Sequence, residues 1–192
     1  MFDAKHLATV AKHYTSLSGR RRELQALSAD ILSGSKRAIF ATQRSDAGAS
    51  SRELGVTVKL VRSGKALVAK EPRLSSEGMW RAALEEYCEA ALYHDAMTKG
   101  RVGKVAELPD DPDLYLGGLS DLTGELTRSA VLAATDRKSK DVKRLTSAVR
   151  DAVEFLLTLN LTGQMRTKFD QAKQNLRKLE EIAFSLSVNE RR

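Results

Sequence analysis

The chain of 192 residues has very few of the residues that cross-link or interrupt a fold: one cysteine, Cys88, and three prolines, Pro72, Pro109 and Pro112. A single cysteine excludes an internal disulfide and is typical of a reducing compartment. No apolar run reaches the roughly 18 residues of a membrane span, and the N-terminus lacks the basic and then apolar pattern of a signal peptide. We therefore expect a cytoplasmic protein without membrane contact, and Cys88 as a small buried thiol rather than a nucleophile.

Aromatic residues are also scarce, at 5% of the chain, whereas the excess of lysine and arginine gives a formal net charge of +7. So few aromatic rings exclude an extensive platform for stacking bases, but the positive charge suits a polyanion held through its phosphates. Basic residues gather in three clusters, at residues 20–22, 36–37 and 137–144. Each cluster is also explained as a solvated helix face, so charge alone does not identify the partner.

Apolar residues recur at helical spacing along most of the chain, and no stretch alternates in the manner of a β-hairpin. The pattern predicts an all-α, single-domain bundle of six or seven helices over residues 1–192. The expected helices cover residues 3–44, as one helix or two in tandem, then 51–69, 75–98, 112 onward, 139–159 and 164–187.

Local signals set three of these boundaries. Glycine and serine make residues 45–51 a predicted loop. Ser75, or the serine after it, is the expected N-cap of the third helix. Asp111 followed by Pro112 predicts the start of the fourth helix, because the acid caps free N–H groups and proline is tolerated at the first helical position.

Two carboxylate pairs lie in the third and fourth expected helices. Glu86 and Glu89 are three residues apart, and Asp121 and Glu125 are four apart. Both spacings make side chains neighbours on one helix face. Glu86 also replaces an apolar residue in an otherwise apolar seam, and a cluster of like charges is costly to bury unless a cation neutralises it. The pattern predicts a metal site, and carboxylate oxygens suit Mg²⁺ or Mn²⁺.

A glycine pair stands one turn before the second carboxylate pair. Gly117 and Gly118 precede Asp121 and remove side-chain bulk from one face of the helix. We expect another backbone to approach closely there.

Three motifs, in this order along the chain, match one known family. Residues 35–40 read Ser-Lys-Arg-Ala-Ile-Phe, residues 86–90 read Glu-Tyr-Cys-Glu-Ala, and residues 121–126 read Asp-Leu-Thr-Gly-Glu-Leu, with Tyr-Leu-Gly-Gly at 115–118. On these motifs the chain resembles the translin family across nearly its whole length, and within it the translin-associated factor X type. It lacks the long insertion that this type often has between the third and fourth helices, so it resembles a compact version.

The resemblance implies a helical subunit that forms a hollow homo-oligomer, expected to be an octamer, with RNA held inside. It also implies a Mg²⁺- or Mn²⁺-dependent endoribonuclease centre in which Glu86, Glu89, Asp121 and Glu125 bind the metal and carry catalysis. The expected substrate is single-stranded or short duplex RNA, with single-stranded DNA as a further candidate partner. Translin itself lacks this acid set and mainly binds nucleic acid, through a basic stretch that ends in Trp-Arg, as residues 80–81 do here. The expected phosphate contacts are Arg20, Arg21, Lys36, Arg37, Arg81 and Arg128.

Other interpretations were weighed against the ribonuclease. In the first alternative, the acids form ordinary surface salt bridges, for example Glu125 with Arg128. Another is a non-catalytic translin-like binding protein, which the complete acid set argues against. A di-iron carboxylate bundle needs a Glu-x-x-His motif on each of two helices, but Asp3, Val10 and Ala91 stand three residues before the histidines. The sequence leaves open the RNA substrate, the number of metals per site and the need for a second, translin-type subunit.

Overall fold

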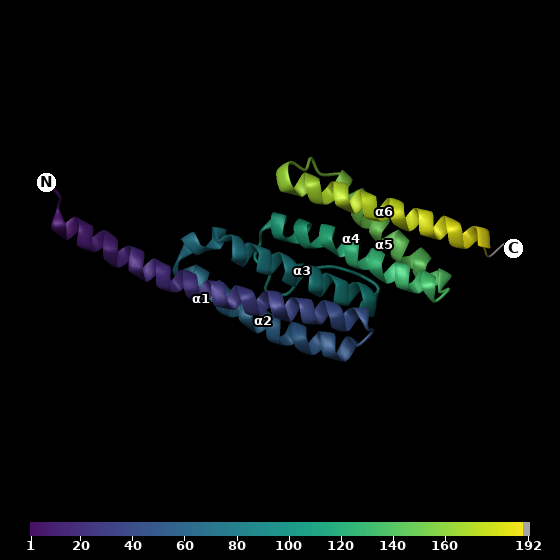
Figure 1. Cartoon of the computed structure of the whole chain (residues 1–192), viewed down its shortest axis with the longest axis horizontal. Coiled ribbons are helices and arrows are strands. Elements are labelled where there is room, and N and C mark those ends of the chain that lie inside the picture. Colours follow the sequence, from purple (N-terminus) through teal and green to yellow (C-terminus); the bar gives the residue numbers. More distant parts are fainter. Residues whose placement is uncertain (190–192) are drawn as a thin grey trace.

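The computed structural model describes residues 1–189 as six α-helices and one short 3-10 helix (Figure 1). No strand occurs among these residues, which confirms the predicted all-α class. None of the described helices is long and apolar enough to cross a membrane. The helices are α1 (Ala4–Gln43), α2 (Ala47–Lys70), α3 (Gly78–Lys99), α4 (Pro112–Thr135), α5 (Ser139–Leu157) and α6 (Gly163–Asn189), and the 3-10 helix η1 (Pro72–Ser76) precedes α3.

The first helix is continuous over 40 residues, so the first of the two expected arrangements is the right one. The prediction of a loop over residues 45–51 was wrong, because α2 already begins at Ala47. The Asp46 carboxylate accepts a hydrogen bond from the Ala49 backbone N–H at 2.8 Å and caps this helix. An aspartate cap therefore outweighs the low helix propensity of the glycine and serines that follow it.

The starts of α3 and α4 differ in how well they were predicted. Ser75 does not cap α3: it lies in η1, where its hydroxyl donates to a backbone carbonyl three residues earlier at 2.7 Å. Glu77 occupies the cap position without a side-chain hydrogen bond to the helix. The predicted start of α4 was right, because Pro112 is its first residue and the Asp111 carboxylate accepts from the Asp113 N–H at 3.0 Å.

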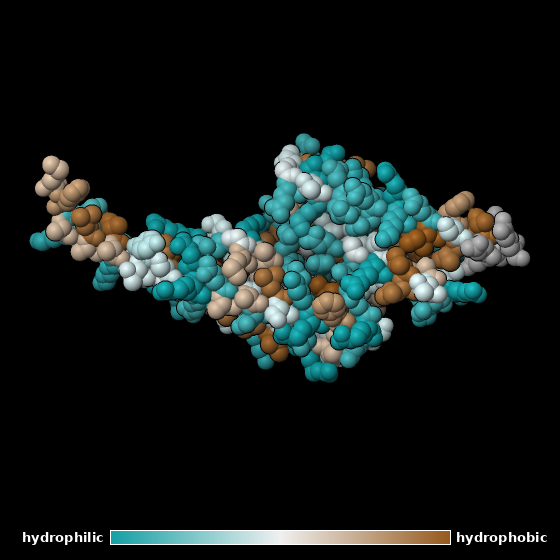
Figure 2. All heavy atoms as spheres, viewed as in Figure 1, coloured by the Kyte–Doolittle hydropathy of each residue, from teal (hydrophilic) through white to brown (hydrophobic). Residues whose placement is uncertain are grey.

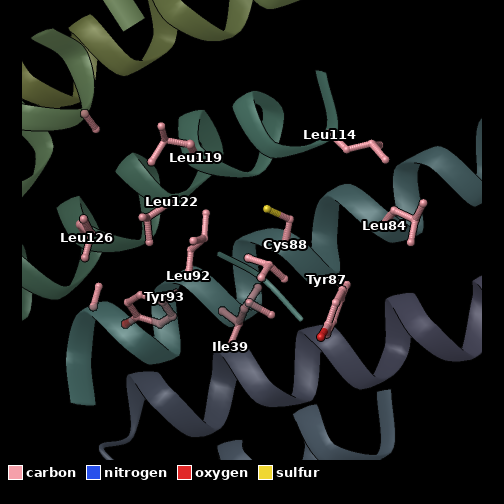
Figure 3. Close-up of a cluster of buried hydrophobic side chains, with 14 of the residues drawn as sticks. Ile39, Leu84, Tyr87, Cys88, Leu92, Tyr93, Leu114, Leu119, Leu122 and Leu126 are labelled. Carbon is pink, nitrogen blue, oxygen red and sulfur yellow. The ribbon is translucent and has the colours of Figure 1, made fainter. Parts of the chain in front are cut away.

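The third helix is central to the fold. It packs on α1 and α2 at one side and on α4 at the other, and α4 packs in turn on α5 and α6 (Figure 1). One continuous core runs from Leu24 in α1 to Leu179 in α6. Figure 3 shows its middle part, in which Leu92 of α3 lies beside Leu122 of α4 and Cys88 lies one turn away along α3.

Two apolar seams run along α3, and most of their residues are buried within the chain. Ala83, Ala90 and Tyr93 of the first seam are fully buried, and Trp80 and Tyr87 of the second are 2% and 3% exposed. Two apolar faces on one helix indicate either a central helix or a subunit contact. The central position of α3 accounts for both seams, so neither seam indicates an oligomer.

The glycine pair of α4 allows α3 and α4 to come very close. A Cβ atom at Gly118 would lie 2.7 Å from the Cβ of Cys88 and 3.0 Å from the backbone nitrogen of Glu89, and one at Gly117 would collide with the Glu85 carboxylate. This confirms the expected backbone approach. Because Asp121 follows Gly118 by one turn, the same crossing brings the Glu89 turn of α3 against the Asp121 turn of α4.

The N-terminal end of α1 extends beyond the other helices (Figure 1). Residues 1–16 are exposed throughout. Leu7, Val10 and Tyr14, which the helical spacing predicted to face a core, are 51%, 50% and 67% exposed. Figure 2 shows apolar atoms along this end of the molecule. The helix forms as expected, but none of the described residues covers its apolar stripe.

Candidate active site

The two predicted carboxylate pairs lie close together where α3 crosses α4. The pKa of Glu89 is raised to about 8, and burial is the largest cause. The negative charges of Asp121, Glu86 and Glu125 add to this rise. Burial also raises the pKa of Glu86; the charge of Lys36 opposes this shift, and Asp121 and Glu125 add to it. With this pKa, most Glu89 carboxyl groups keep their proton at neutral pH unless a cation stabilises the charged form.

A lysine from α6 supplies positive charge at this crossing. The Lys168 Nζ atom lies 2.5 Å from Asp121 Oδ2 and 2.8 Å from Glu85 Oε1, and its side chain is 17% exposed. Burial lowers the pKa of Lys168, but its hydrogen bonds to the two carboxylates outweigh burial and leave the pKa raised. Lys168 is therefore an ammonium ion that joins α6 to both α3 and α4.

Two amide side chains from α1 and α6 donate hydrogen bonds near the acids. At the C-terminal end of α1, Gln43 Nε2 donates a hydrogen bond to Glu125 Oε2 at 2.5 Å. Asn175 Nδ2 of α6 donates to Thr123 Oγ1 at 2.9 Å. Among the ion pairs of residues 1–189, none joins Glu125 to Arg128, so the partner of Glu125 is an amide from another helix.

The donor set of the site fits Mg²⁺ or Mn²⁺, because carboxylate oxygens are the ligands that these ions prefer. The side chains are not gathered for binding as they lie: residues 1–189 include no group of three or more His, Cys, Asp or Glu side chains close enough to hold a metal ion. Two of the four carboxylates face protein partners instead, Asp121 toward Lys168 and Glu125 toward Gln43. Each contact occupies one oxygen of its carboxylate, Asp121 Oδ2 and Glu125 Oε2, and so limits how that carboxylate can bind a metal ion.

A polar cleft of about 530 Å³ opens beside the carboxylates, between α4 and α6. The α6 side of the cleft carries hydroxyl, ammonium and amide groups, which donate and accept hydrogen bonds. Such a lining suits a sugar–phosphate unit better than an apolar ligand. The residues that line the cleft are Glu89, Ser120, Asp121, Gly124, Thr167, Lys168, Gln171 and Asn175.

Comparison with known proteins gives the family. Residues 19–190 match the Translin family. The chain belongs to the translin family. This confirms the resemblance seen in the sequence motifs. No curated protein matches the sequence.

Solved structures of translin-family relatives have the same fold. The crystal structure of AfC3PO superposes with a TM-score of 0.88 at 20% identity, covering 96% of this chain and 98% of that one. The crystal structure of apo-NeC3PO gives 0.86 at 22% identity, with 97% and 98% covered. The AfC3PO–duplex RNA complex gives 0.86 at 20% identity, with 96% and 97% covered. At these identities the likeness shows the shared fold.

Four of the six basic residues predicted to contact RNA form ion pairs within this translin-family chain. The other two, Lys36 and Arg128, are exposed. The charge of Lys36 reaches Glu86 and lowers its pKa, and Arg128 stands three residues after Glu125, as a neighbour on the same helix face. Lys36 and Arg128 are thus the better placed to contact a phosphate near the acids. The four ion pairs are Arg20–Glu71 (3.3 Å), Arg21–Glu77 (2.7 Å), Arg37–Glu53 (2.9 Å) and Arg81–Asp111 (2.6 Å).

Three residues of the site were not among those predicted from the sequence: Glu85, Lys168 and Gln43. Glu85 had a signal, because it stands four residues before Glu89 and so on a neighbouring part of the same helix face. Lys168 and Gln43 had none. They reach the acids only because α6 and α1 pack on the α3–α4 pair, which no local pattern reports.

Cys88 and His94 belong to the packing around the site. Cys88 is a buried free thiol, and burial raises its pKa to about 12, which agrees with the predicted inert thiol. Figure 3 shows its sulfur directed toward α4. His94 Nδ1 lies 2.9 Å from Ser50 Oγ, which lies 2.8 Å from Thr42 Oγ1. These three residues form a polar network between α1, α2 and α3.

Proposed function

We propose that this translin-family protein is a metal-dependent endoribonuclease in which Glu86, Glu89, Asp121 and Glu125 bind Mg²⁺ or Mn²⁺. One observation carries the proposal: four carboxylates share a partly buried crossing, where burial and then the charges of the other three raise the pKa of Glu89 to about 8. Burying like charges together is costly, and a bound cation would offset that cost. The sequence motifs that resemble the factor X type support the same assignment.

The chemistry that a divalent cation supplies when bound is polarisation of the phosphate and a lowered pKa of its water ligand. The chain's own residues set where this chemistry takes place. The close crossing at Gly118 fixes the two acid pairs relative to each other, and the hydrogen bond from Gln43 orients Glu125. The polar cleft beside Asp121 receives the sugar–phosphate backbone. Lys36 and Arg128 attract its phosphates, and no nucleophilic side chain is needed.

We further propose that the protein holds single-stranded or short duplex RNA inside a homo-octamer. Two findings support this part of the proposal. The exposed apolar stripe of residues 1–16 is the kind of surface that a second subunit covers. A structure with the same fold, AfC3PO, is in complex with duplex RNA. The single cysteine suits the reducing cytoplasm, where we expect the protein to act.

A second candidate function is RNA binding without cleavage. It is favoured by the contacts of Asp121 with Lys168 and of Glu125 with Gln43, which already satisfy two of the four carboxylates without a metal. In that case the acids stabilise the packing of α1, α4 and α6, and RNA is held by the basic residues alone.

Cleavage assays with matched single-stranded and duplex RNA and DNA separate the two candidates. The ribonuclease proposal predicts cleavage of RNA with Mg²⁺ or Mn²⁺ and none in EDTA. Binding without cleavage at any metal concentration would favour the second candidate. Undiminished cleavage in EDTA would contradict both.

A further inference from the structure

Lys168 brings a positive charge to the edge of the acid cluster, at Asp121. Among the ion pairs of residues 1–189, it is the one lysine or arginine that pairs with any of the four carboxylates of the site. It approaches Asp121 from α6 while holding Glu85 of α3 with the same ammonium group. The ammonium group of Lys168 thus links α3, α4 and α6.

We propose that Lys168 is a built-in counter-ion that competes with the divalent cation for Asp121 and, once displaced, turns to the RNA phosphate in the adjacent cleft. The inference rests on the proposed function, because it assumes that the four acids bind a metal. It assigns to Lys168 a role as a positioning residue: Lys168 sets how tightly the site binds metal and couples metal loading to the capture of substrate.

The chemistry of the lysine side chain allows both positions. Its ammonium group is a compact charge on a flexible stem of four carbons, with three donors that rotate to suit a new acceptor. Lys168 lines the polar cleft as well as pairing with Asp121. A small rotation of the stem would therefore move the charge from one carboxylate oxygen toward the cleft without moving α6.

The charges give the direction of the competition. With Lys168 in place, Asp121 Oδ2 accepts a hydrogen bond from the ammonium group and is less available to a metal ion. The positive charge also repels an approaching divalent cation over a few ångströms. Loss of the Lys168 charge should then strengthen metal binding, which is the opposite of what loss of a structural contact does.

The experiment measures Mn²⁺ binding to the full chain by electron paramagnetic resonance of free Mn²⁺, without RNA. Lys168→Met should bind Mn²⁺ about tenfold more tightly than the wild type, and Lys168→Arg, which keeps the charge, should bind Mn²⁺ as the wild type does. Lys173→Met is the matched control, because Lys173 lies on the same helix and pairs with Asp170 on its exposed face. RNA affinity in the presence of Mn²⁺, measured with a cleavage-resistant RNA, should fall for Lys168→Met and stay unchanged for Lys173→Met.

Equal or weaker Mn²⁺ binding by folded Lys168→Met would overturn the inference. If this variant does not fold, the double variant Glu85→Gln with Lys168→Met is compared with Glu85→Gln alone. The double variant leaves one carboxylate fewer without a partner. The same gain in Mn²⁺ affinity is expected, and its absence would overturn the inference. Wild-type protein that binds no Mn²⁺ at millimolar concentration would remove the proposed function and the inference together. Wild-type protein that binds Mn²⁺ and cleaves RNA, beside a Lys168→Met variant without tighter binding, would remove the inference alone.

Discussion

Gly118 of α4 lies directly against Glu89 of α3: a Cβ atom at Gly118 would come within 3.0 Å of the Glu89 backbone nitrogen. This contact joins the packing of the fold to the geometry of the site. The two helices cross at the point where glycine removes the side chain. Glu86 and Asp121 lie within a turn of that point, and Glu125 lies about two turns along α4. A substitution at Gly118 therefore changes stability and the spacing of the carboxylates together.

Substitution of this glycine should destabilise the protein. We expect Gly118→Ala to lower the free energy of unfolding by about 1–3 kcal/mol, because the added methyl group forces α3 and α4 apart in a packed core. Gly55→Ala is the matched control: Gly55 is an exposed helical glycine with no atom within 4 Å of a built Cβ. It should stabilise the protein by roughly 0.5–1 kcal/mol. Urea unfolding of both variants measures the two effects, and an unchanged or raised stability of Gly118→Ala would contradict the close crossing.

Stability should also depend on pH in a direction set by Glu89. Its pKa is raised to about 8 in the folded protein, above the ordinary value of 4.5. Between these values the folded chain binds the proton that the unfolded chain has lost, so the free energy of unfolding falls as pH rises from 5 to 8. One such proton gives a slope of at most about 1.4 kcal/mol per pH unit. Urea unfolding of the metal-free protein at several pH values measures this slope.

The control for this pH dependence is Glu89→Gln, which has no proton to lose and should show a shallower slope. Burial raises the pKa of Glu86 as well, so a smaller slope of the same sign should remain. Stability of the wild type that is flat or that rises between pH 5 and pH 8 would show that Glu89 is not held among uncompensated charges.

The basic residues should fall into two groups in RNA binding. Lys36→Ala should weaken RNA binding and reduce the slope of log affinity against log salt by about one, because an exposed charge beside Glu86 is free to meet a phosphate. Arg37→Ala, one residue away on α1, should change RNA binding less, because Arg37 is already paired with Glu53 at 2.9 Å. Gel-shift titrations at several salt concentrations compare the two. A flat salt dependence of the wild type would argue against phosphate contacts as the main source of affinity.

Much of this molecule could be predicted from local sequence patterns. The features that could not be predicted arise from contacts between segments that are distant in the sequence. Helical spacing predicted the all-α class, and the Asp111-Pro112 signal predicted the start of α4. The carboxylate spacing within α3 and α4 found two acid pairs, and the glycines at 117–118 predicted that another backbone would come close. The partners of those acids were not predictable, because Lys168 and Gln43 come from helices that reach the site only through tertiary packing.

The apolar stripe at the start of α1 shows a second limit of sequence reasoning. Helical spacing at Leu7, Val10 and Tyr14 predicts that one face avoids water, but it does not say whether the same chain or another covers that face. Within the described residues nothing covers it. The salt-bridge interpretation met the same limit: Arg128 is near Glu125 in sequence, yet the hydrogen-bond partner of Glu125 is Gln43 of α1.

Cleavage by the Asp121→Asn variant tests the central claim most directly. The substitution keeps the volume of the side chain but removes the charge that a metal ion needs, and Asp151→Asn, at an exposed position on α5, is the control. With circular dichroism to establish that both variants fold, we expect Asp121→Asn to lose cleavage while its RNA affinity in metal-free buffer stays level or rises, and Asp151→Asn to behave as the wild type. A folded Asp121→Asn protein that cleaves RNA at the wild-type rate would contradict the claim that these carboxylates form the catalytic site.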